Sequence, residues 1–312
     1  MNVQFNRPST NSDGRAQTLG RVTLASHLGI SAPQIDIKDE PLGPRLGAKR
    51  PTRITCRLGG CASHGGCVAV ANGIDCGVLG PQAAGHWADV CRDLARRDGL
   101  QPLIVEREGV PCGMTIAHPN GDGTLDLDVQ RMAPLTGAEL AEFTEDAATR
   151  PRSVFVGPAL VDEDSRNLHA AITRLASSRA LMAHPSLLRH NQQFSEIGKL
   201  YAYVQMNYAE ACILDESTCD IAKLGCRARF LLGDQVDFAI TNGPKRGLLW
   251  AEGRWYIIEP CVVRTVVSDI GAGDVWGAAF MIARWYFDAT PNLTVSGLRI
   301  DSTGYPATSW RC

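Results

Sequence analysis

The sequence predicts an α/β protein with a mostly parallel central sheet, helices on both faces of that sheet and a small β lid. Apolar, strand-like runs alternate with segments of helical spacing along the chain, which is the order expected when strands are joined by crossover helices. The chain has 312 residues, of which 45% are hydrophobic and 21% are charged, so it can bury a large core. We therefore expect one large domain with an appended lid.

Charge and cysteine content restrict the function classes. The formal net charge is −2, and no basic stripe interleaved with aromatic residues is present, so a small-molecule substrate fits better than nucleic acid. No run approaches the ~20 apolar residues of a membrane span, and the first residues lack the apolar core of a secretory signal; we expect a cytoplasmic protein without a membrane partner. The 11 cysteines are expected to be reduced, and the spacing of Cys56, Cys61 and Cys67 matches no common zinc pattern.

The first part of the chain contains the lid. Residues 1–20 are polar and are expected to form an extension, with the main domain covering 21–312. The run PLGPRLGAKRP is expected to be a loop between lid strands, which we place near 36–58 and 101–130. Between them, GGCASHGGCVAVANGIDCGVLG is interpreted as a glycine-rich turn followed by small apolar residues and a short strand.

Helix and hairpin signals follow. Residues 86–100 have helical spacing and end at Gly99, which is typical of a helix C-cap. Two strands are predicted at 100–108 and 113–129 around the turn Asn120-Gly121. In LTGAELAEF, Thr136 and Glu139 form a capping box at the start of a helix. The later elements are a strand at 153–160, a helix at 165–181, a strand turning into a helix at 200–214, a strand, glycine turn and hairpin at 236–258, and a strand, glycine turn and apolar helix at 261–287.

The segment Gly271-Ala272-Gly273-Asp274 carries the strongest chemical signal. It follows β-branched residues and opens an apolar helix, and free backbone N–H groups at such a turn hold anions such as phosphate. A carboxylate would repel phosphate, but it suits a general base that accepts the proton of an attacking hydroxyl. The alternative is that Asp274 only caps the helix.

A second alternative for this segment is dinucleotide binding. Gly271, Gly273 and Gly277 give the spacing G-x-G-x-x-x-G between a strand and a helix. That fingerprint needs a further strand and an acidic residue about 20 positions on, whereas Pro291 follows soon after this helix. Dinucleotide binding is therefore disfavoured.

Several segments, in order along the chain, resemble the PfkB or ribokinase-like carbohydrate kinases. VVSDIGAGDVWGAAF resembles the second signature of that family, and Gly59-Gly60 with VAVANGIDCGVLG resembles the first. Asn207 to Glu210 resembles the N-x-x-E motif, Thr241 to Gly247 resembles the T-x-G-x-x-G turn, and PCGMTIAHPNGDG resembles a lid segment. The resemblance covers roughly residues 52 to 287 and implies a ribokinase-like three-layer sandwich.

The resemblance also implies roles for individual residues. Asp274 would be the base, with Gly271, Ala272 and Gly273 as the anion hole. Asn207 and Glu210 would act indirectly on Mg²⁺, and the family's ATP would lie against Thr241, Gly243 and Gly247. The acceptor would contact Gly59, Gly60, His64 and Asp36. Each motif also has a purely structural interpretation, as a turn, a solvent-facing helix position or a requirement of chain geometry.

The chain departs from the family pattern at several places. Ser268 replaces the leading Asp of D-x-x-G-A-G-D, and Asp269 is shifted by one position. His64 stands where the family usually has Asn. Asp36 is the nearest candidate for the acceptor-binding Asp, with Asp39 competing, and the C-terminal segment PNLTVSGLRIDSTGYPATSWRC lacks the usual adenine-lining pattern.

These observations favour an ATP-dependent kinase that phosphorylates a hydroxyl of a sugar-like or nucleoside acceptor. By analogy with the family, lid strands would pair in a homodimer. One alternative is a catalytically silent relative that binds a sugar or nucleotide for regulation. A structural α/β protein without a ligand is a third, but it leaves the ordered motifs unexplained.

Overall fold

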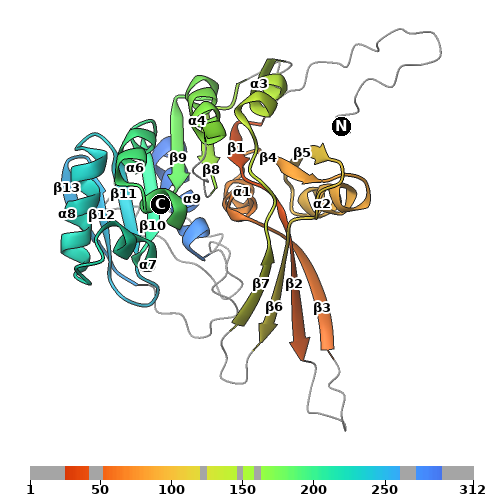
Figure 1. The fold of residues 1–312 in the computed structure, drawn as a ribbon, viewed down its shortest axis with the longest axis horizontal. Helices are drawn as coiled ribbons and strands as arrows, with labels where there is room; N and C mark the ends of the chain where they lie inside the picture. The colour runs from red at the N-terminus through yellow and green to blue at the C-terminus, as the bar shows by residue number, and fades with distance from the viewer. Residues whose placement is uncertain are drawn as a thin grey trace.

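The computed structural model describes residues 25–41, 52–119, 125–145, 150–157, 163–260 and 272–289. Two sheets are present, a large one and a small one that extends away from it (Figure 1). The large sheet has nine strands in the order β13-β12-β11-β10-β9-β8-β1-β4-β5. These strands are β1 (His27–Ile30), β4 (Cys76–Ala83), β5 (Gln101–Arg107), β8 (Ser153–Val156), β9 (Ser178–Met182), β10 (Tyr203–Asn207), β11 (Asp237–Thr241), β12 (Gly247–Ala251) and β13 (Arg254–Ile258).

The large sheet is mostly parallel, as predicted. From β11 to β5 all neighbouring strands are parallel, and only β12 and β13 join antiparallel at one edge. Helices cover both faces and complete the three-layer sandwich (Figure 1). One face carries α1 (Cys61–Ala71), α2 (His86–Arg97) and α9 (Ala272–Tyr286); the other carries α3 (Gly137–Glu145), α4 (Glu163–Leu175), α6 (Asn191–Gly198) and α8 (Ile221–Leu232). Three short helical turns are α5 (Pro185–Leu188), α7 (Tyr208–Ala211) and η1 (Cys212–Leu214).

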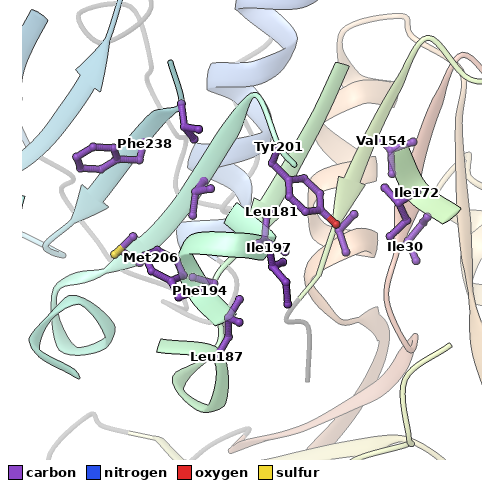
Figure 2. Close-up of a cluster of buried hydrophobic side chains, with 14 of the residues drawn as sticks. Ile30, Val154, Ile172, Leu181, Leu187, Phe194, Ile197, Tyr201, Met206 and Phe238 are labelled. Carbon is purple, nitrogen blue, oxygen red and sulfur yellow. The ribbon is translucent and has the colours of Figure 1, made fainter. Parts of the chain in front are cut away.

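Side-chain alternation explains why both faces are covered. In β8, Val154 and Val156 point to the face of α4, whereas Phe155 points to the face of α1 and α9, and all three are at most 2% exposed. Figure 2 shows Ile172 of α4 beside Val154 and Ile30 in the first of these clusters. Burying each such side chain stabilises the fold by roughly 1.5–3 kcal/mol.

The small sheet forms the lid. Its order is β3-β2-β6-β7, with β2 and β6 parallel and the other pairs antiparallel. Its strands are β2 (Gln34–Pro41), β3 (Thr52–Gly59), β6 (Met114–Pro119) and β7 (Leu125–Gln130). The lid segment expected at 101–130 is thus divided, because Gln101–Arg107 forms the edge strand β5 of the large sheet instead.

Local signals in the sequence are confirmed in several elements. Helix α2 ends at a C-cap Asp98, and Gly99 follows with a φ of 77°. At α3, Glu139 accepts the backbone N–H of Thr136 at 2.8 Å, and Thr136 Oγ1 accepts the N–H of Glu139 at 3.1 Å, which is the predicted capping box. The strand-to-helix change at 200–214 and the hairpin after β11 also form as predicted.

Two interpretations need correction. The helix predicted at 165–181 ends at Leu175, because Ser178–Met182 forms the strand β9 between β8 and β10. Most of the stretch after Gly60 is the helix α1, not a turn. Its glycines allow close packing, since a Cβ on Gly65 would lie 3.0 Å from Phe155 and 3.2 Å from Ala278. Tertiary contacts therefore outweigh the poor helix propensity of Gly65 and Gly66. Helix α8 was not anticipated at all, although Asp220 caps it by accepting the N–H of Ala222 at 2.8 Å.

Some predictions lie outside the described residues. They concern the extension at 1–20, the loop at 42–51, the turn Asn120-Gly121 and the strand and turn at 261–271. Within the described chain, every helix is too short or too polar to pass through a lipid bilayer.

Candidate active site

A cavity of about 260 Å³ lies between the large sheet and the lid. Ser31, Gly157 and His184 line it just after the carboxyl ends of β1, β8 and β9, where ligands bind in open parallel sheets. The lid contributes Asp36 and Thr115. Because the volume falls near the lower end of small-molecule sites, roughly 300–1,000 Å³, the cavity suits one sugar-sized molecule.

Three elements bring Asp274, His64 and Asp36 together at this cavity. Asp274 lies in the first turn of α9, His64 in the first turn of α1 and Asp36 on the lid strand β2. His64 Nδ1 is 3.2 Å from Asp274 Oδ2, and His64 Nε2 is 3.7 Å from Asp36 Oδ2. The three side chains are 22%, 13% and 21% exposed for His64, Asp274 and Asp36, so water reaches them only partly.

His64 carries a positive charge in this arrangement. Burial alone would lower the pKa of its imidazole, but the hydrogen bonds and charges of Asp274 and Asp36 raise it to about 9. Two carboxylates thus share one imidazolium across the boundary between lid and main domain. Cys61 adds a neutral neighbour, because burial and the Asp274 charge raise the pKa of its thiol well above the ordinary value.

The glycine pair makes room for this cluster. A Cβ on Gly59 would lie 2.1 Å from Asp36 Oδ1, so only glycine leaves space for that carboxylate. Gly60 precedes α1 with a φ of 91° and lines the cavity, and a Cβ there would be 2.9 Å from the Ala32 carbonyl oxygen. Gly59 therefore leaves space for the Asp36 carboxylate, whereas Gly60 lines the cavity itself.

Gln205 on β10 holds the start of α9 in place. Its Nε2 donates to the Gly273 carbonyl at 2.6 Å, and its Oε1 accepts from the Tyr203 hydroxyl at 2.7 Å. Gln205 is 1% exposed, and a Cβ on Gly277 would lie 2.2 Å from its Oε1. The buried amide thus fixes the turn that carries Asp274.

Asn207 and Glu210 form a capping box around α7. Asn207 Oδ1 accepts the Glu210 N–H at 2.8 Å, and Glu210 Oε2 accepts the Asn207 N–H at 2.7 Å. Burial raises the pKa of Glu210 to about 7. The hydrogen bond from Asn207 lowers this pKa, and the negative charge of Asp274 raises it further. The motif therefore has a structural role, because its two side chains cap α7. Glu210 also lies close enough to Asp274 for the two charges to interact.

The turn predicted at the nucleotide lies beside that motif. Thr241 at the end of β11 pairs with Asn207 at the end of β10. Gly243 has a φ of 52°, and a Cβ on Gly247 would be 2.6 Å from the Ile240 carbonyl oxygen. None of Asn207, Thr241, Gly243 and Gly247 lines the cavity at Asp274.

Other predicted residues have separate outcomes. Ala272 and Gly273 begin α9, whereas Gly271, Ser268 and Asp269 lie outside the described residues. The described residues contain no group of three or more His, Cys, Asp or Glu side chains placed to hold a metal ion, and the described cysteines, Cys56, Cys61 and Cys67 among them, form no disulfide with one another.

The sequence did not point to Gln205, Thr115, Arg131 or His184. Gln205 is a polar residue in an otherwise apolar strand, which is a recognisable signal. The other three depend on how the lid pairs and closes over the sheet, which no local pattern encodes.

No family model and no curated protein sequence matches the chain. Solved structures do match. The phosphofructokinase-2 from Escherichia coli, in complex with substrates and products, is 15% identical with a TM-score of 0.68, covering 88% of this chain and 90% of that one. The adenosine kinase from Sinorhizobium meliloti is 16% identical with a TM-score of 0.64, covering 89% and 95%. A PfkB protein from Polaromonas is 11% identical with a TM-score of 0.64, covering 87% and 92%.

These likenesses extend over nearly the whole length of each chain. At 11–16% identity they show a likeness of fold. This chain has the ribokinase-like fold of the PfkB kinases, as its sequence motifs predict.

Proposed function

We propose that the protein transfers the γ-phosphate of ATP to a hydroxyl of a small sugar-like or nucleoside acceptor, with Asp274 as general base. The observation that carries this proposal is the position of Asp274. It faces a half-open, sugar-sized cavity from the first turn of a helix. A base must lie within hydrogen-bond reach of the hydroxyl it deprotonates, and an acceptor bound in this cavity would lie beside Asp274.

One carboxylate oxygen of Asp274, Oδ1, is not held by His64 and can act as the base. Its Oδ2 is held by His64 Nδ1, which fixes the orientation of the carboxylate. Oδ1 can then accept the proton of the acceptor hydroxyl while the oxygen of that hydroxyl attacks the phosphorus atom. His64 and Asp36 offer a donor and an acceptor to neighbouring hydroxyls of the same molecule.

The first turn of α9 would stabilise the transferred phosphoryl group. Helix α9 has 15 residues, and its first backbone N–H groups have no partner within the helix, so together with the helix dipole they favour an anion. Gln205 holds the Gly273 carbonyl and therefore keeps this turn rigid. Electrostatic stabilisation of this kind needs no reorganisation during the reaction.

The residues present fit an indirect role with Mg²⁺. Glu210 is a largely buried carboxylate close to the charge of Asp274, and a cation nearby would relieve that repulsion. Proteins commonly hold Mg²⁺ through one or two carboxylates, waters and substrate phosphates. When bound, Mg²⁺ would neutralise charge on the phosphates; a neighbour of the ribokinase II type from E. coli has been solved with ATP and Mg²⁺.

The lid would exclude water, whose attack on ATP is the competing reaction. Asp36 and Thr115 of the lid line the same cavity as Asp274. Removal of the lid from the acceptor would therefore open the base to solvent.

A ligand-binding protein without catalysis is the second candidate. The observation in its favour is that Asp274 is already paired with a cationic His64, whereas a working base must be free to take a proton. Such a protein would bind ATP or a sugar and would turn over neither.

The deciding experiment measures ADP release with Mg·ATP against a panel of sugars, sugar acids, nucleosides and polyols. We expect one acceptor class to raise turnover and Asp274→Asn to reduce it at least about 100-fold, which is the low end of general-base effects. Asp93→Asn, on the exposed side of α2, is the matched control and should keep full activity. Binding of ATP or a sugar, detected as a rise in Tm, without turnover on any acceptor would replace the kinase with the ligand-binding protein.

A further inference from the structure

Arg131 and His184 line the same cavity as Asp36 and Asp274. Arg131 follows the lid strand β7, and His184 follows β9 of the large sheet. Arg131 Nη1 lies 2.7 Å from His184 Nε2, so this contact joins lid and main domain over the cavity.

The register of the lid places Arg131 on its inner face. Asp36 pairs with Thr115, and Thr115 pairs with Val129, and all three line the cavity as one row across β2, β6 and β7. Arg131 is two residues beyond Val129, so strand alternation directs it to the same face. Strand β7, which Arg131 follows, lies two strand spacings from β2, which carries Asp36. This separation is about 10 Å.

The charges of the cavity are unevenly compensated. Asp36 and Asp274 share the imidazolium of His64. The contact that Arg131 makes is with an imidazole, that of His184. Its partner His184 is neutral, since burial and then the nearby charges of Arg131 and Arg189 lower the pKa of that imidazole.

The neutral ring orients the guanidinium without neutralising it. A guanidinium can only donate, so His184 Nε2 accepts from Arg131 at 2.7 Å and the ring proton lies on Nδ1. Nδ1 then donates to Ser186 Oγ at 2.7 Å, and this bond replaces the longer 3.2 Å contact in which Nδ1 would accept the Ser186 N–H. Arg131 keeps further N–H donors for a ligand. Arg131 is exposed to solvent although it lines the cavity, and a guanidinium with free donors is suited to a carboxylate or a phosphate, which it can bind through two parallel hydrogen bonds.

We propose that Arg131, oriented by His184, binds an acidic group of the acceptor, so that the substrate is an acidic sugar derivative and not a neutral sugar. This inference rests on the proposed function, because it assigns the second end of the same acceptor. The hydroxyl to be phosphorylated lies at Asp274, and the carboxylate or phosphate of the acceptor lies at Arg131. A carboxylate and a phosphate would both bind the guanidinium in this way, and the experiment below distinguishes between them.

The experiment uses calorimetric binding to the full-length protein with two matched sets of probes: gluconate, glucose 6-phosphate and glucose, and ribonate, ribose 5-phosphate and ribose. Within at least one set, we expect an acid to bind at least about tenfold more tightly than its neutral partner, as for one hydrogen bond to a charged group. Whether the carboxylate or the phosphate shows this gain identifies the acidic group.

The variant Arg131→Gln should lose the preference for the acid while binding the neutral sugar unchanged. Arg189→Gln is the matched control, because it removes the same charge from a residue that is exposed and does not line the cavity. His184→Gln should weaken the preference for the acid less than Arg131→Gln does, since it removes only the side chain that orients the guanidinium. An equal affinity for acid and neutral sugar in both sets, or a preference that survives Arg131→Gln, would overturn the inference.

The outcomes separate this inference from the proposed function. Turnover of a neutral sugar that depends on Asp274 but ignores Arg131 would retain the kinase and refute the acidic acceptor. Tight binding of an acid that depends on Arg131, without ADP release, would retain the anion site and refute the kinase.

Discussion

Raising the pH through 9 should remove the charge of His64 and with it the link between Asp36 and Asp274. The imidazole lies 3.2 Å from the first-turn carboxylate of α9 and 3.7 Å from that of the lid strand β2. At neutral pH the two ion pairs hold lid and main domain together. Deprotonation leaves two carboxylates that repel each other across the same gap.

The size of this effect follows from the pKa. The imidazole titrates at about 9 in the folded protein instead of at the ordinary 6.5. At about 1.4 kcal/mol per pH unit, this difference corresponds to roughly 3 kcal/mol. It is an upper limit, because His64 is 22% exposed and water screens its ion pairs. Because the folded pKa is the higher one, the stabilisation is complete below pH 6.5 and is lost as the pH rises to about 9.

The assay compares urea unfolding of the wild type and His64→Gln between pH 6 and 10. The stability advantage of the wild type over the variant should shrink by up to roughly 3 kcal/mol across that range. His169→Gln is the control. Burial lowers the pKa of His169 to about 4, so that residue is neutral throughout and its removal should cost the same at every pH.

A direct measurement complements the unfolding experiment. The protein contains 7 histidines, and the imidazole C–H signal that disappears in His64→Gln should titrate in NMR with a midpoint near 9. A midpoint near 6.5, or parallel stability curves for wild type and His64→Gln, would show that the two carboxylates do not hold an imidazolium. The electrostatic description of the site would then be wrong.

Two further substitutions test other parts of the site. Gly277→Ala should lower the free energy of unfolding by about 1–3 kcal/mol, because the new Cβ would lie 2.2 Å from Oε1 of the hydrogen-bonded Gln205. Gly273→Ala is the control, because a Cβ there would lie 3.7 Å from the nearest atom. Equal stability of the two variants would contradict the reasoning. Glu210→Gln should stop the loss of stability that the wild type suffers between pH 4.5 and about 7, since Glu210 has its pKa raised by burial. Urea unfolding across that pH range measures the change, and an unaltered pH slope would count against a buried carboxylate.

The sequence predicted most elements with a strong local pattern. The apolar run after Gly273 and the capping box of α3 are signals within a few residues of sequence, and both predicted helices form. The helix α1 was missed for the opposite reason. Gly65 and Gly66 disfavour a helix in isolation, and only the close approach of Phe155 and Ala278 explains them.

The site divides in a similar way. Asp274 was identified from a motif within four residues of sequence, whereas Arg131 depends on the register of β2, β6 and β7. Asp36 was named as a candidate in spite of its spacing, and its place at the cavity follows from the pairing of β2 with β3 and the space left by Gly59. Register joins residues far apart in the sequence, so local patterns cannot supply it.

The arrangement of charges explains how the lid could select its acceptor. Near the base, Asp36, His64 and Asp274 already compensate one another in part, so a neutral hydroxyl can enter without leaving a charge unpaired. At Arg131 the compensation has to come from the ligand. An acidic acceptor would supply the anion, whereas a neutral sugar would leave the exposed guanidinium to water. Discrimination would therefore come mainly from the hydrogen bonds that an acidic acceptor gains at Arg131.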